Sequence, residues 1–158
     1  MTSSPTILQA VDHPELWQPW FKQPDTWKPW RAFLACLFGL PMDDTAKELV
    51  RTCSGWEAVS GPFREAWLIC GRRAGKSFIL ALVAVFLSVF RDWSPHLAPG
   101  EMGTVMVIAR DRKQARVIFR YIRALLTRVP VLQQMIVRET AEEIELDNGP
   151  FSAPTTAA

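Results

Sequence analysis

The stretch between residues 66 and 90 constrains the fold of this chain more than any other part. Residues 66–70 read Ala-Trp-Leu-Ile-Cys and are wholly apolar, and residues 78–90 form an almost unbroken apolar run. Between them lies a short turn that contains two glycines. A short apolar run favours a buried strand, and a longer one favours a buried helix. The stretch therefore predicts a strand, a glycine-containing loop and a helix in direct succession.

The turn is similar to the phosphate-binding pattern G-x-x-x-x-G-K-[ST]. Gly75, Lys76 and Ser77 match the end of the pattern, whereas Cys70 stands at its first glycine and Gly71 follows one position later. Glycines in such a loop allow a tight turn that directs backbone N–H groups towards phosphate oxygens, and the start of the helix adds positive partial charge. The alternative is an ordinary strand-to-helix turn with a lysine on the surface.

These residue types predict a site for ATP and Mg²⁺. The Lys76 ammonium is expected to reach the β- and γ-phosphates, and the Ser77 hydroxyl is expected to be the metal ligand. The expected nucleotide-binding residues of the loop are Gly71, Arg72, Arg73, Ala74, Gly75, Lys76 and Ser77.

The fold class follows from a second apolar run at residues 104–109. Asp111 is a natural N-cap for a helix that extends from there to about Arg128. Fully apolar strands that alternate with helices predict an α/β fold with a parallel sheet covered by helices. Because only two such strands can be identified, the prediction is an incomplete P-loop NTPase domain.

Three regions are expected along the chain. Residues 1–30 form an irregular arm rich in Pro and Trp, residues 31–149 form the partial ATPase domain, and residues 150–158 form a disordered tail. Residues 142–146 alternate between polar and apolar, and a hairpin turn follows at residues 147–149. No strand-like sequence comes after this turn, so we expect the chain to stop within a hairpin.

The net charge of +2 conceals a strong asymmetry. Residues 71–138 hold twelve Lys and Arg against three Asp and Glu, whereas residues 139–158 hold five acidic residues and no basic ones. A basic block that starts at the loop suits a phosphate or nucleic-acid ligand, with a solvated arginine face as the alternative. The 3 cysteines show no pairing or metal-ligand pattern, and the longest apolar run is too short for a bilayer. A cytoplasmic location without membrane contact is therefore expected.

The loop and its flanks resemble the large subunit of tailed-phage terminases, the motors that package viral DNA. The most specific likeness is Arg72-x-x-Gly75-Lys76-Ser77, which is similar to the deviant Walker A motif of that family. Residues 63–70 resemble its lead-in strand, residues 104–115 its second strand and helix, and residues 138–149 the hairpin that follows. The resemblance covers roughly residues 27–149.

The resemblance implies an ATPase that drives DNA translocation in the host cytoplasm. Its implied partners are double-stranded DNA, the portal and the terminase small subunit, with a homo-oligomer as a further expectation. Arg72 and Lys76 are the implied catalytic residues, because cations beside the transferred phosphoryl group offset its developing negative charge. A ring ahead of the loop is expected to stack on the base. Trp30 is one candidate for this role, and core packing is the alternative.

The second half of an ATPase site is missing from the sequence. No apolar strand ends in a Walker B carboxylate, because Arg110 interrupts the run before Asp111 and helix capping explains that aspartate more simply. We therefore expect a fragment truncated before Walker B that binds nucleotide without hydrolysing it. The alternatives are a P-loop NTPase of another class, such as a helicase-like one, and a non-functional remnant of a broken reading frame.

An arginine stripe is a further candidate feature. Four arginines fall on one arc of the helix expected after Asp111, namely Arg112, Arg116, Arg120 and Arg123. Such a stripe suits DNA phosphates or an acidic neighbouring subunit, and a solvated helix face is the alternative.

Overall fold

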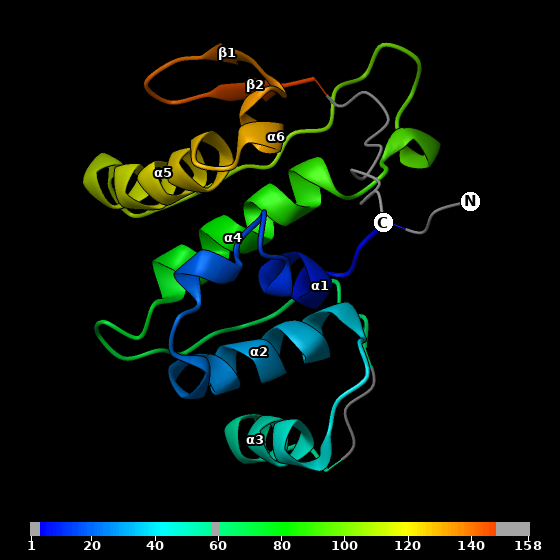
Figure 1. The fold of residues 1–158 in the computed structure, drawn as a ribbon, viewed down its shortest axis with the longest axis vertical. Coiled ribbons are helices and arrows are strands. Elements are labelled where there is room, and N and C mark those ends of the chain that lie inside the picture. The colour runs from blue at the N-terminus through cyan, green and yellow to red at the C-terminus, as the bar shows by residue number, and fades with distance from the viewer. Residues whose placement is uncertain (1–3, 58–60, 148–158) are drawn as a thin grey trace. The chain divides into compact units, whose positions relative to one another are not determined.

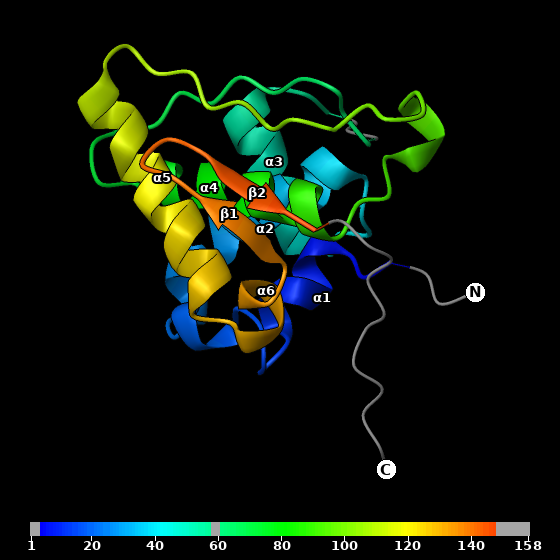
Figure 2. The same cartoon turned by 90° about the horizontal axis from the view of Figure 1, so that it is seen from above.

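The computed structural model describes residues 4–57 and 61–147. The chain divides into two compact units, with the boundary after Ala74. Within the described residues there are six α-helices, two short 3-10 helices and one antiparallel pair of strands. Figures 1 and 2 show these elements in two views.

The first unit is helical up to its final extended segment. Its elements are α1 (Ile7–Asp12), the 3-10 helix η1 (Gln18–Trp20), α2 (Pro24–Phe38) and α3 (Asp44–Ser54). The apolar face of α1 packs against α2 and buries Ile7 and Val11, and Trp17 is fully buried in the same unit. The Trp17 ring is thus one of the largest fully buried side chains of the structure.

Local capping explains where the helices of the first unit begin and end. The Asp43 carboxylate accepts a hydrogen bond of 2.7 Å from the N–H of Ala46 and so starts α3. Gly39 and Gly55 follow α2 and α3 in the left-handed conformation, with φ of 65° and 73°. Glycine adopts this conformation without the steric cost that a Cβ imposes.

The Pro-rich arm contains more helix than the sequence predicted. Pro24 occupies the first turn of α2, where a missing N–H costs nothing, and Pro29 lies only one turn further on. The Arg31 guanidinium donates two hydrogen bonds to the Asp12 carboxylate, at 2.7 and 2.8 Å, and thereby links α2 to α1. The hydrogen bonds to Asp12 raise the pKa of Arg31.

The second unit is built on the packing of two long helices. Its elements are α4 (Lys76–Val89), the 3-10 helix η2 (Ser94–His96), α5 (Arg112–Thr127), α6 (Pro130–Gln133), β1 (Ile136–Glu139) and β2 (Ile144–Leu146). α4 lies against α5, and the rings of Phe78 and Tyr121 meet edge to face between them, with centroids 5.6 Å apart. The side chains of Ile79, Leu82 and Leu125 are completely or almost completely buried.

The predicted parallel sheet is wrong, because the described residues contain no parallel strand pair. Residues 66–70 and 104–109 are extended but belong to no sheet. Trp67 is 88% exposed and Ile108 is 85% exposed, so these apolar side chains do not form a buried sheet interior. Apolar runs favour extended, buried structure, yet a strand forms only where another strand satisfies its backbone groups.

The partner of the C-terminal strand precedes it in the chain. β2 pairs antiparallel with β1, with Glu139 opposite Ile144 and Ile136 opposite Leu146. The expected strand at residues 142–146 is therefore present in shortened form, but its partner is not the segment after residue 147. The predicted hairpin turn lies mostly outside the described residues, and the predicted tail at 150–158 lies entirely outside them.

Removal of a buried side chain between α4 and α5 should destabilise the second unit. Leu125→Ala deletes a fully buried side chain, and we expect a loss of about 2–5 kcal/mol in the free energy of unfolding. Leu80→Ala on α4 is the control, because this side chain is 45% exposed and should cost much less. Urea unfolding followed by circular dichroism measures both variants, and equal effects would contradict the packing described.

Candidate phosphate-binding loop

Residues 70–77 connect the extended segment of the first unit to the first turn of α4. The boundary between the two units falls within this loop, so residues 70–74 belong to the first unit and residues 75–77 begin the second.

Gly75 forms the N-cap of α4 in a left-handed conformation, with φ of 85°. Its carbonyl oxygen accepts hydrogen bonds from the N–H groups of Phe78 at 3.0 Å and Ile79 at 3.1 Å, which starts the helix. No side chain caps this end of α4. An uncapped helix N-terminus offers positive partial charge and backbone N–H groups to an anion. The predicted helix start at Lys76 is confirmed.

Arg73 adopts the left-handed conformation, with φ of 61°. Within the described residues it is the only non-glycine residue with a positive φ. For a residue with a Cβ this conformation costs about 1–2 kcal/mol, and such residues concentrate at functional turns. The sequence analysis placed Arg73 in the loop but did not predict its backbone conformation.

Trp30 of α2 binds the backbone of the loop. Its indole Nε1–H donates a hydrogen bond of 2.8 Å to the carbonyl oxygen of Ala74. The ring also lies edge to face with Phe33, with centroids 5.9 Å apart, which orients the indole. The sequence suggested Trp30 as a base-stacking candidate. The structure gives it a direct link to the loop, a contact for which no local sequence signal exists.

The loop is electrostatically positive. Arg72, Arg73 and Lys76 lie within five positions, whereas no acidic residue occurs between residues 66 and 91. Both arginines are exposed, and Lys76 and Ser77 are half-buried in the first turn of α4. Cations close in the sequence to an uncapped helix N-terminus favour phosphate as a ligand through charge and direct hydrogen bonds.

The described residues contain no group of three or more His, Cys, Asp or Glu side chains placed to hold a metal ion. The Ser77 hydroxyl is the metal ligand that the sequence predicts, and phosphate oxygens and water would complete the coordination of a metal bound there. Mg²⁺ commonly binds in this way. Asp111, rejected as a Walker B residue from the sequence, accepts a hydrogen bond of 2.8 Å from the N–H of Gln114 and caps α5.

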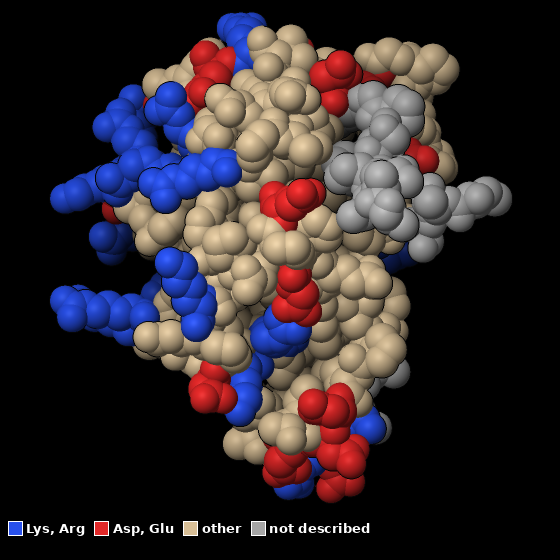
Figure 3. All heavy atoms as spheres, in the orientation of Figure 1, with Lys and Arg blue, Asp and Glu red and all other residues tan. Residues whose placement is uncertain are grey.

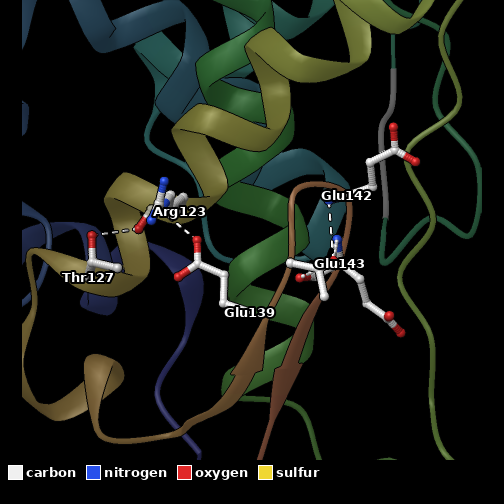
Figure 4. Close-up of polar contacts among 6 residues, drawn as sticks. Arg123, Thr127, Glu139, Glu142 and Glu143 are labelled. Carbon is white, nitrogen blue, oxygen red and sulfur yellow. Dashed lines mark hydrogen bonds and ion pairs between the residues drawn. The ribbon is translucent and has the colours of Figure 1, made fainter.

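The arginine stripe divides into two parts. Arg123 forms an ion pair with Glu139 of β1, as Figure 4 shows. The remaining three are exposed and form no ion pair with the described residues: Arg112, Arg116 and Arg120. Lys and Arg side chains gather at the upper left of Figure 3, where Figure 1 places α5. The exposed stripe is thus a separate cationic surface of the second unit.

Two further observations bear on the class of protein. None of the helices in the part of the chain that the structure describes is both long and apolar enough to cross a bilayer. In comparisons with known proteins, no family model, curated protein or solved structure matches the chain. The likeness to terminases therefore depends on the motif residues themselves.

Loss of the Trp30 hydrogen bond should loosen the loop. In Trp30→Phe the loop loses one hydrogen bond, worth about 1 kcal/mol, so trypsin cleavage after Arg72 and Arg73 should accelerate about fivefold. Trp93→Phe is a matched control, because its indole N–H donates a similar bond of 2.8 Å to the carbonyl of Leu87. Mass spectrometry of early digestion products measures the cleavage, and identical rates in Trp30→Phe and wild type would exclude the anchoring role.

Proposed function

We propose that residues 71–77 bind the phosphates of a nucleoside triphosphate, ATP with Mg²⁺, and that the chain is the nucleotide-binding segment of a terminase-like DNA-packaging ATPase. The observation that carries the proposal is a cationic turn that leads directly into a helix of 14 residues whose N-terminus has no side-chain cap. Phosphate groups are the ligands that such a turn and helix start recognise best.

Each loop residue has a distinct role in the proposal. Lys76 binds the terminal phosphates, and Ser77 contributes its hydroxyl to Mg²⁺. Arg72 supplies a guanidinium that is always charged and matches phosphate oxygens with two parallel hydrogen bonds. The positive φ of Arg73 turns the backbone between these groups. Trp30 holds the end of the turn through Ala74.

The proposal separates binding from hydrolysis. An ATPase needs a carboxylate to hold Mg²⁺ and a second group to orient the attacking water. The loop and α4 carry no acidic residue, since none occurs between residues 66 and 91. Asp111, the one sequence candidate nearby in the chain, already caps α5. The chain is therefore proposed to bind ATP without turning it over.

The choice of ATP and of a packaging motor comes from the resemblance around Arg72 and Gly75. The exposed stripe of Arg112, Arg116 and Arg120 supports a phosphate-rich partner such as double-stranded DNA. A portal and a small subunit as partners follow from the resemblance alone.

Lys76→Ala should weaken ATP binding by about 10- to 100-fold, because one charge-assisted contact to phosphate is worth about 1.5–3 kcal/mol. Isothermal titration with ATP and Mg²⁺ measures the affinity. Lys113→Ala is the control, since it removes an exposed lysine from α5 and leaves the loop unchanged. Equal affinity of Lys76→Ala and wild type would refute the phosphate-binding role of the loop.

Phosphate release from ATP by the wild-type chain should not exceed that of Lys76→Ala. The physical reason is the lack of a carboxylate in the loop and α4 to position Mg²⁺ and water. A coupled phosphate assay with saturating ATP measures the rate. Turnover that disappears in Lys76→Ala would show that a catalytic carboxylate is present elsewhere in the chain.

A further inference from the structure

The segment at residues 104–109 belongs to no helix or strand of the structure, although its sequence favours a strand. Its six residues are Thr-Val-Met-Val-Ile-Ala, a composition of high β-propensity without charge or proline. Its backbone N–H and carbonyl groups form no hydrogen bond with the described part of the chain. Met106 is 74% exposed and Ile108 is 85% exposed. A segment of this kind is a template for pairing with another strand.

A groove of about 990 Å³ runs along this segment within the second unit. One side is formed by residues 101–107, and the others by α4, α5 and residues 141–146. Apolar side chains from both helices line it, among them Val85, Phe119 and Ile122. A two-stranded pair is marginal by itself in water but is stabilised when it packs on helices. The groove provides such a helical surface beside residues 104–109.

The charges at the two ends of the segment indicate what pairs with it. Glu101 lies before the segment. After it come Arg110, Asp111, Arg112 and Lys113, which together carry a net charge of +2, and Arg110 forms an ion pair with Asp111. If two copies of the segment pair antiparallel, the acidic end of each lies beside the basic end of the other. Parallel pairing would instead place like charges together, which is unfavourable. The segment is thus complementary to itself in one orientation.

We propose that two copies of this chain associate through antiparallel pairing of residues 104–109, each strand lying along the groove of the other copy. Such a contact is isologous, with the same surface used on both copies, so it closes at a dimer. Backbone hydrogen bonds provide affinity, and alternate side chains enter the groove, as in other strand-addition complexes.

Met106→Lys is the central test. We expect wild type to dimerise with rising concentration in sedimentation velocity. The charge placed in an apolar contact should raise the dissociation constant more than about tenfold. Because Met106 is exposed in the monomer, the variant should retain the wild-type circular dichroism. Val137→Lys is the matched control, since Val137 is 63% exposed on β1 and does not line the groove, and its dimerisation should be unchanged.

Charge reversal tests the orientation. Glu101→Arg should weaken the dimer, and Arg112→Glu combined with it should restore affinity, because antiparallel pairing of residues 104–109 places residue 112 opposite residue 101. The carboxylate of Glu101 also accepts a hydrogen bond from the N–H of Ala98, so the rescue separates charge pairing from a disturbed turn. Hydrogen exchange should show amides 104–109 protected at high concentration and open at low concentration. Any of four results would overturn the proposal. The wild-type chain could stay monomeric at all concentrations, or Met106→Lys could leave the dissociation constant unchanged. Protection of amides 104–109 could be independent of concentration, or the chain could form assemblies larger than a dimer.

Discussion

Burial of α4 is the interaction on which the second unit depends. This helix is apolar on nearly every face, and its large side chains Ile79, Leu82 and Val85 are almost completely removed from solvent. Each such side chain contributes about 1.5–3 kcal/mol when buried. α5 supplies one apolar face for this burial and keeps its arginines on the other. The start of α4 at Lys76, and hence the place where the loop must end, is determined by this packing together with Gly75.

Features set by neighbours in the chain were predictable from the sequence, and features set by distant partners were not. The cap at Asp111 depends on an N–H group three residues away, so the residue type at that position was sufficient. The parallel sheet failed because an apolar run indicates a preference for burial and says nothing about whether a partner strand exists. The partner of β2 was sought after residue 147 because the turn signal lies there, whereas its actual partner, β1, precedes it in the chain.

The same distinction applies to the loop. The motif predicted a glycine-dependent turn and a helix from Lys76, and both are present. The left-handed conformation of Arg73 was not predictable, because arginine has no preference for it and the shape of the whole turn imposes it. The hydrogen bond between Trp30 and Ala74 was not predictable from the sequence either, because no sequence pattern near Trp30 specifies which backbone carbonyl its indole N–H will bind.

The bond between Trp30 and Ala74 joins residues that are 44 positions apart. Closing a chain segment of that length from the unfolded state costs about 3 kcal/mol of entropy or more, whereas one hydrogen bond returns about 1 kcal/mol. This single bond therefore cannot order the intervening chain. Its stability depends on the packing of the helices of the first unit, to which the hydrogen bonds of Arg31 with Asp12 contribute. The conformation of residues 70–74 thus depends on the helices that precede them in the first unit.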